Sequence, residues 1–166
     1  MLESYQRSCS KTIEKPNYEI SLAEGENEAN TEENNLSELK SIRNKNINRV
    51  IIAHLNINSI RNKIDMLTNN VSGNIDILML SETKIDNSFP TQQFKINGFS
   101  NPYRIDRSCH GGGILLYVRE GIISKCLKSV EIPNNLECVF IEINLRKKKW
   151  LLCYSYNPHK GLIKDH

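Results

Sequence analysis

The sequence lacks the long apolar runs that membrane proteins need. Its longest ones, such as residues 50–53 and Ile114–Val118, are the length of strands, whereas a membrane-spanning helix needs about 18 apolar residues or more. The first 28 residues also lack the apolar core of a signal peptide. We therefore expect a protein that stays inside the cell, nuclear or cytoplasmic, not secreted and without a membrane partner.

Paired cysteines are missing as well, and aromatic residues are few, at 7% of the chain. The five cysteines are scattered, with no Cys-x-x-Cys pair and no cluster with histidine at zinc spacing (Cys9, Cys109, Cys126, Cys138 and Cys153). This pattern argues against a disulfide framework and against a zinc site. It predicts the reduced thiols of a cytosolic or nuclear protein.

Charge is unevenly distributed along the chain. Residues 1–38 carry nine acidic and three basic side chains, a net charge of −6, whereas residues 39–166 carry ten acidic and nineteen basic ones, a net charge of +9. Residues 1–46 are rich in Glu and Asn, so we expect an acidic, disordered leader with at most a marginal helix over residues 37–44. The folded domain is expected over residues 47–166, and its basic charge is compatible with a nucleic-acid partner.

Hydrophobic periodicity predicts that the folded part begins as an α/β unit. Residues 50–55 are apolar on both faces, which is typical of a central strand buried on both sides. A helical pattern follows, with Ser59 as its expected N-cap and apolar residues at 4-3-4 spacing (Ile60, Ile64, Leu67 and Val71). A second buried strand over residues 75–81 completes a strand–helix–strand unit, which predicts a parallel pair.

The second half of the sequence has the pattern of antiparallel β structure. Residues 114–120, 136–144 and 149–157 have the composition of strands, and the basic turn LRKKK is expected to join the last two as a hairpin. Together with the first half, this predicts a mixed α/β (α+β) fold class.

Two polar residues close the two buried strands. Asn56 ends the first and Glu82 ends the second, where a strand normally gives way to a turn residue. Taken alone, Asn56 is as readily a strand-ending residue that bonds its own backbone. If the strands are parallel neighbours, however, the amide and the carboxylate lie near one another at the edge where α/β sheets bind ligands. Such oxygen ligands suit Mg²⁺, so the pair predicts a metal site.

Other motifs resemble catalytic units but lack the partners that such units need. His110 and three glycines form a run found in esterase oxyanion holes, yet the chain has no Gly-x-Ser-x-Gly motif, and no P-loop Gly-Lys-Ser/Thr follows. We interpret the glycines as a hairpin that enters a closely packed strand. Asp165 and His166 could form a catalytic pair, but they fall in the first turns of an expected helix, so we assign them no catalytic role. Tyr156 ends a strand just before Pro158, and its hydroxyl is as readily in water as on a ligand.

Four segments resemble, in order and spacing, a single known family: IIAHLNINSIRNKID, IDILMLSETKID, GGGILLYVREGI and LLCYSYNPH. The family is the endonuclease domain of non-LTR (LINE-type) retrotransposons, within the endonuclease/exonuclease/phosphatase superfamily of deoxyribonuclease I-like fold. The resemblance covers about residues 48–166, and the leader has no counterpart. It implies the N-terminal part of a four-layer α/β/β/α sandwich.

The resemblance also implies roles for individual residues. Asn56 matches an Asn that orients the scissile phosphate or the attacking water, Glu82 the Glu that binds the divalent metal, and Tyr156 a tyrosine that contacts the phosphate. Asn56 is also a candidate metal ligand, because it is expected to lie beside Glu82 at the sheet edge. The residues assigned to substrate binding are Arg104, Arg107, Tyr156 and His159. The family nicks target DNA for retrotransposition by phosphodiester hydrolysis assisted by Mg²⁺ or Mn²⁺.

One departure from the family concerns its later motifs. Relatives place an Asp-x-Asn motif and then a Ser-Asp-His motif after the tyrosine turn, whereas this sequence reaches His166 with neither. In the family an Asp–His pair supplies the general base, so we expect a truncated and inactive copy. We also expect it to form about one of the two sheets and to expose apolar residues of Ile114–Val118 and of residues 139–143.

Two other functions stay open on the sequence. A non-catalytic nucleic-acid-binding or interaction module would contact phosphates through its basic part, and its binding would weaken steeply with salt. A phosphatase of the same superfamily, acting on a small phosphorylated molecule, is the third candidate.

Overall fold

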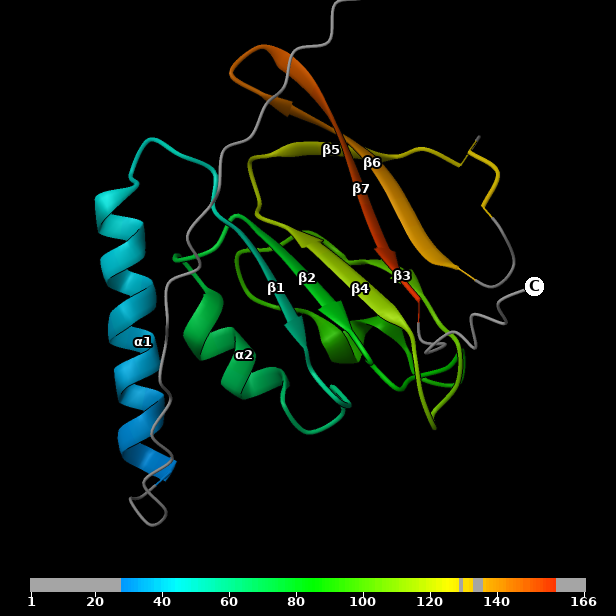
Figure 1. Cartoon of the computed structure of the whole chain (residues 1–166), viewed down its shortest axis with the longest axis horizontal. Helices are drawn as coiled ribbons and strands as arrows, with labels where there is room; N and C mark the ends of the chain where they lie inside the picture. The colour runs from blue at the N-terminus through cyan, green and yellow to red at the C-terminus, as the bar shows by residue number, and fades with distance from the viewer. Residues whose placement is uncertain (1–27, 129, 133–135, 158–166) are drawn as a thin grey trace, which may run out of the picture.

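The computed structural model describes residues 28–128, 130–132 and 136–157, which form a mixed α and β fold (Figure 1). Within these residues there are two α-helices and seven strands, and the strands form two sheets. The predicted mixed α and β class is therefore confirmed. Neither α-helix of this part of the chain is both long and apolar enough to cross a membrane.

The first sheet has four strands in the order β1 (Ile52–Asn56), β2 (Ile77–Ser81), β4 (Ile114–Val118) and β3 (Tyr103–Ile105). β1 and β2 are parallel, as predicted, and helix α2 (Ile64–Val71) makes the connection between them. β4 then runs antiparallel to both β2 and β3. A short 3₁₀ helix, η1 (Thr91–Phe94), lies between β2 and β3 in the chain.

The second sheet has three antiparallel strands in the order β5 (Ile123–Cys126), β6 (Glu137–Leu145) and β7 (Lys148–Tyr156). The predicted hairpin between β6 and β7 is confirmed. Its two turn residues, Arg146 and Lys147, have φ values of 51° and 64°. Left-handed backbone at both positions marks a type I′ turn, whose twist matches that of the strands it joins.

The two sheets pack face to face and bury the strands that the sequence leads us to expect exposed. Every residue of β4 is buried, and Val139, Ile141 and Ile143 of β6 are at most 5% exposed. They share one core with Ile77. The expectations of a single sheet and of exposed inner strands are therefore wrong, because β5, β6 and β7 supply a second sheet that covers the first.

The opposite face of the four-stranded sheet is covered by the helices, so the layers are helix, sheet and sheet (Figure 1). Helix α2 begins later than predicted, with Lys63 as its N-cap. Ser59 is not the cap, because its backbone is left-handed with φ 79°. Ile60 is fully buried in the same core as Leu67, but it lies in the loop before the helix. Its spacing from Ile64 therefore wrongly predicts that it belongs to the helix.

Strand β1 is an edge strand, which corrects the prediction of a strand buried on both sides. Ile52 is 48% exposed and Leu55 is 42% exposed. Within the described residues only β2 pairs with β1. An apolar composition on both faces does not distinguish a central strand from an uncovered edge.

Helix α1 (Glu28–Lys45) corrects the prediction of a disordered leader through residue 46. Leu39 packs against the helix-side core. Arg43 donates a hydrogen bond to Asp76 at 2.7 Å and another to the main-chain oxygen of Asn74 at 3.0 Å. These long-range contacts supply the support that the isolated sequence lacks. The rest of the predicted leader, residues 1–27, lies outside the described residues.

Asp76 fixes the start of both parallel strands. Its carboxylate is 1% exposed, and it accepts the Ile51 N–H at 2.7 Å and pairs with Arg43 at 2.7 Å and with Arg119 at 2.9 Å. One buried carboxylate thereby joins α1, β1 and the end of β4.

Replacing Asp76 by Ala should lower the free energy of unfolding by about 2–3 kcal/mol, measured by urea denaturation. The loss leaves the Ile51 N–H and two guanidinium groups without their shared acceptor, although both arginines keep access to water. The control is Glu120→Ala, an exposed carboxylate in the turn after β4, which should change stability by less than about 0.5 kcal/mol. Equal losses in the two variants would contradict this account of Asp76.

Candidate functional site

The candidate site lies where three loops meet at the carboxyl ends of β1 and β2. In Figure 1 the arrowheads of β1, β2 and β7 point toward the same, lower end of the molecule. The Ser59 N–H donates to the Glu82 carbonyl at 2.7 Å, and the Thr83 N–H donates to the Gly113 carbonyl at 3.2 Å. The loop after β1, the loop after β2 and the turn before β4 are thus held together by backbone hydrogen bonds.

Left-handed backbone is concentrated in these loops. Asn58, Ser59, Glu82 and Lys84 have φ values between 45° and 79°, although none of them is glycine. The left-handed region is unfavourable for residues with a Cβ, at a cost of about 1–2 kcal/mol each. Such strain persists only where surrounding contacts hold it, and it gathers at binding and catalytic sites.

Glu82 is the centre of the site. Continued strand alternation would direct its side chain to the helix-covered face, together with Leu78 and Leu80. Its left-handed backbone interrupts that alternation, and the carboxylate instead meets the second sheet. Oε1 accepts the Tyr156 hydroxyl at 2.5 Å, and Oε2 accepts the Gly112 N–H at 3.0 Å. The structure therefore brings together two predicted residues that lie 74 positions apart.

Two hydrogen bonds and two nearby cations lower the pKa of the Glu82 carboxyl and favour its ionised form. The hydrogen bond from Tyr156 is the largest cause that lowers the pKa of Glu82, and the Gly112 N–H and the nearby Lys84 and Arg107 lower it further, while burial opposes them. The same hydrogen bond, from the other side, raises the pKa of Tyr156 to about 12. At neutral pH the Glu82 carboxylate is therefore ionised and accepts a hydrogen bond from the Tyr156 phenol, which keeps its proton.

Asn56 lies at the same sheet edge but is not joined to Glu82. Its Cα pairs with that of Ser81, the residue before Glu82. Its amide oxygen accepts the Asn58 N–H at 3.2 Å, which is the local backbone bond expected of a strand-ending Asn. The strands that carry Asn56 and Glu82 are neighbours, as predicted, but the structure shows no hydrogen bond between the two side chains in the described residues.

The predicted substrate-binding arginines make internal contacts. Arg104 forms a two-pronged pair with Asp106 at 2.6 Å and 2.7 Å and donates to the carbonyls of Phe89 and Asp86. Its side chain is 13% exposed, so it holds the loop before η1 rather than facing solvent. Arg107 is 37% exposed and can reach a ligand. The last predicted substrate residue, His159, lies outside the described residues.

Glu137 is a site residue that the sequence reasoning missed. Its Oε2 accepts the Gly113 N–H at 2.8 Å, and Oε1 lies 3.9 Å from Arg107. It is 7% exposed, and its Cα pairs with that of Tyr156 across the hairpin. The available signal is a glutamate directly before the four apolar residues 138–141 of β6, the same kind of irregularity that identifies Glu82 at the end of a strand.

The glycine turn, residues 111–113, is required by close approach. A Cβ on Gly112 would lie 2.5 Å from Oε1 of Glu137 and 2.6 Å from Cδ of Arg107, and the φ of Gly112 is 74°. The consecutive N–H groups of Gly112 and Gly113 each hold one carboxylate, one from each sheet. The prediction of a glycine hairpin entering a closely packed strand is confirmed.

Glu82 can serve as a single carboxylate ligand of a hard cation. Each of its oxygens accepts one hydrogen bond and retains a second lone pair, and its lowered pKa keeps it anionic. Mg²⁺ is commonly held by one or two carboxylates and keeps several waters, so this donor set fits it. In the described part of the chain, three or more His, Cys, Asp or Glu side chains do not gather into a metal-binding group.

Comparison with known proteins assigns no family to this chain. No model of a known protein family matches the sequence, and no curated protein matches it either.

Replacing Gly112 by Ala should destabilise the protein more than the same change at another left-handed glycine. Gly73 has φ 75°, and a methyl group added there would meet no atom within 4 Å, so Gly73→Ala reports backbone strain alone, about 1 kcal/mol. Gly112→Ala adds overlap with Glu137 and Arg107 and should cost about 2–4 kcal/mol in urea unfolding. A cost at Gly112 no larger than at Gly73 would show that the turn is not held this closely.

Replacing Tyr156 by Phe should lower stability in a pH-dependent way. Because the pKa of Glu82 is lower in the folded protein than its ordinary value of 4.5, its contribution is present above that value and is lost as the pH falls through the folded pKa. Urea unfolding should therefore show a loss of about 1–2 kcal/mol at pH 7 that shrinks toward pH 3.

Tyr103→Phe is the matched control, because the Tyr103 hydroxyl bonds the neutral Ser124 at 2.9 Å. Its cost should be the same at pH 7 and at pH 3, because this hydrogen bond joins two hydroxyl groups and involves no carboxylate. A cost of Tyr156→Phe that is likewise independent of pH would contradict the ionic character assigned to the pair with Glu82.

Proposed function

We propose that the Glu82 site is the metal and phosphate end of a Mg²⁺-dependent DNA endonuclease site of the non-LTR retrotransposon type. The observation that carries the proposal is the hydrogen bond between Tyr156 and Glu82, because these are the residues to which the resemblance assigns phosphate contact and metal binding. The layer order of helix, sheet and sheet supports a further proposal, that the fold is part of a four-layer α/β/β/α sandwich.

The roles of the individual residues follow from their contacts. Glu82 would hold the cation, and Tyr156 and Gly112 fix the direction of its two oxygens. Arg107, which is partly exposed beside the glycine turn, would contact a phosphate oxygen of the DNA. A bound Mg²⁺ would supply charge stabilisation for the phosphodiester under attack and would lower the pKa of a coordinated water.

The described residues contain two histidines, His54 and His110. His54 bonds the Ser81 hydroxyl at 3.1 Å, and its ring contacts that of Tyr154. His110 is exposed, and neither described histidine forms a hydrogen bond with Glu82. General-base catalysis typically contributes about 10²–10⁴-fold to the rate, so this site should bind cation and phosphate far better than it cleaves. We therefore propose that this chain is inactive or nearly so as a nuclease.

The test measures binding of a labelled DNA duplex to the full chain with and without Mg²⁺. Mg²⁺ should tighten binding by the wild-type chain severalfold and should have no such effect on Glu82→Gln, which keeps the hydrogen-bonding shape but loses the charge. Glu142→Gln is the matched control, because Glu142 lies on β6 and pairs with Lys149 instead. It should behave as the wild type does.

A supercoiled plasmid, incubated with each protein and Mg²⁺, tests the rate. Nicking by the wild type should not exceed that by Glu82→Gln. Nicking well above that background would overturn the proposed inactivity and strengthen the endonuclease assignment. An equal effect of Mg²⁺ on DNA binding by wild type and by Glu82→Gln would contradict the proposal that Glu82 binds the metal.

A non-catalytic nucleic-acid-binding module is the second candidate, favoured by the net charge of +9 on residues 39–166. It predicts DNA binding that is independent of Mg²⁺ and of Glu82 but falls steeply between about 50 and 200 mM salt. Binding that does not change over this range of salt would exclude it.

A further inference from the structure

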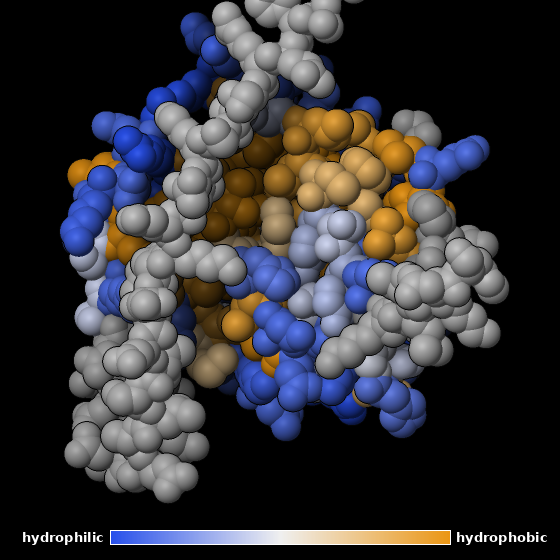
Figure 2. Space-filling view, viewed as in Figure 1, coloured by the Kyte–Doolittle hydropathy of each residue, from blue (hydrophilic) through white to orange (hydrophobic). Residues whose placement is uncertain are grey.

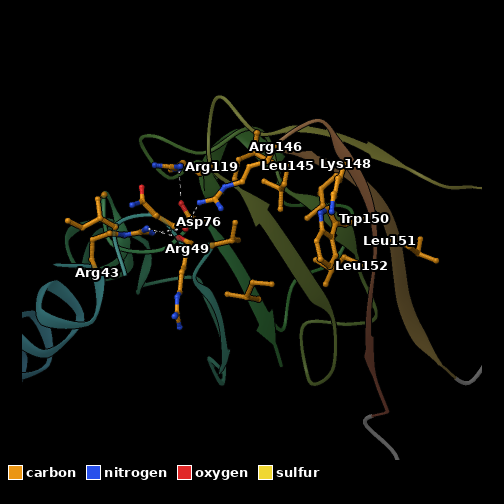
Figure 3. Close-up of a pocket in the computed structure, with 17 residues that line it drawn as sticks. Arg43, Arg49, Asp76, Arg119, Leu145, Arg146, Lys148, Trp150, Leu151 and Leu152 are labelled. Carbon is orange, nitrogen blue, oxygen red and sulfur yellow. Dashed lines mark hydrogen bonds and ion pairs between the residues drawn. The ribbon is translucent and has the colours of Figure 1, made fainter. Parts of the chain in front are cut away.

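A large groove opens at the end of the sheets opposite to Glu82. It has a volume of about 890 Å³ and lies between β1 and the β6–β7 hairpin (Figure 3). The rings of His54 and Tyr154, with centroids 5.8 Å apart, bring the two sheets together partway along β1 and β7. Beyond that contact, Ile52 and Trp150 line the groove.

The walls of the groove are apolar and unusually exposed. Ile47, Ile52, Trp150 and Leu151 are 76%, 48%, 56% and 66% exposed, and all four line it. Figure 2 shows apolar surface, in orange, gathered around a hollow on this face of the molecule. A contiguous exposed apolar surface of this kind marks an interaction site rather than ordinary surface.

The groove is bordered by two sheet edges that lack a partner within the described residues. β1 is the end strand of the four-stranded sheet, and β7 is the end strand of the three-stranded sheet. An edge strand presents unpaired N–H and C=O groups, which pair readily with an added extended segment. The geometry therefore favours an occupant in extended conformation.

The rim of the groove is strongly basic. Five cationic side chains line it, and Figure 3 shows them around its mouth (Arg43, Arg49, Arg119, Arg146 and Lys148). The one carboxylate among the described lining residues is Asp76, which is already paired with Arg43 and Arg119. Two copies of this rim would repel one another, so charge disfavours a symmetric dimer and favours an acidic occupant.

The chain itself contains a segment of this chemistry. Residues 18–22, Tyr-Glu-Ile-Ser-Leu, alternate between apolar and polar side chains, which is the pattern of a strand with one apolar face. Glu24 and Glu26 follow, and residues 1–38 carry a net charge of −6. These residues precede the part of the chain that the structure describes.

The segment is long enough to reach the groove. The C-terminal end of α1 borders the groove at Arg43, and Glu28, the first residue of the helix, lies 15 residues earlier and therefore about 23 Å away. Leu22 precedes Glu28 by six residues and Tyr18 precedes it by ten. Extended chain of those lengths spans roughly 20 Å and 33 Å, which brackets the distance required.

We propose that the groove is the docking site of the chain's own acidic segment, residues 18–22, which adds as a strand at the edge of β1. Tyr18, Ile20 and Leu22 would cover the exposed apolar wall, and the glutamates would face the basic rim. The docked segment would shield the open edge of the sheet from pairing with other molecules. The proposal does not depend on the metal site, because Glu82 lies at the other end of the sheets.

Trp150 provides a direct reporter, because it is the only tryptophan in the chain and lines the groove. The experiment records its fluorescence emission and its quenching by acrylamide in the full chain. The double variant Ile20→Ser with Leu22→Ser should shift the emission to longer wavelength and raise the quenching constant relative to wild type. Ile13→Ser, which removes an apolar residue outside the alternating stretch, should leave both unchanged.

A second variant tests the basic rim. Arg49→Glu should cause the same change in emission and quenching as the double variant, and so should raising the salt concentration in the wild type. Identical emission and quenching in wild type, the double variant and Arg49→Glu would overturn the proposal. Emission that changes with protein concentration would also overturn it, because it would identify a second copy as the occupant.

Discussion

Two consecutive backbone N–H groups hold the candidate site together. Gly112 donates to Glu82 after β2, and Gly113 donates to Glu137 at the start of β6, so one tight turn binds a carboxylate from each sheet. Tyr156 lies opposite Glu137 in the β6–β7 hairpin and donates a hydrogen bond to Glu82. Glu82, the glycine turn, Glu137 and Tyr156 are thus linked in a ring of contacts. Any side chain on Gly112 would collide with Glu137 and Arg107. The conformation of the turn, the packing of the two sheets and the direction of the Glu82 carboxylate therefore depend on one another.

The parts of the fold that the sequence predicts are those with local or periodic causes. The parallel pair of β1 and β2 and the hairpin of β6 and β7 follow from apolar runs and a short basic turn. Helix α1 is not predictable in this way, because a buried ion pair between Arg43 and Asp76 ties it to the sheet. The exposure of β1 also escapes prediction, since composition reports apolarity but not whether a neighbouring strand covers it.

The candidate site shows the same division. Glu82 and Tyr156 stand out in the sequence because each places a polar group at the end of a strand, and the structure joins them. Glu137 carries a similar signal at the start of β6, but its contact with the glycine turn of the other sheet depends on the tertiary structure. Arg104 resembles a surface cation in the sequence, yet its donors are taken by Asp106 and two carbonyls, which only the tertiary structure reveals.

The central proposal is that Glu82 would bind a divalent cation in the geometry set by Gly112. Its most direct test is the NMR signal of the Gly112 amide, whose proton is bonded to the Glu82 carboxylate, during a titration with Mg²⁺. The account predicts a saturable shift of this signal, no shift for the remote Gly73, and loss of the effect in Glu82→Gln. A Gly112 signal that does not move as Mg²⁺ is added would contradict it.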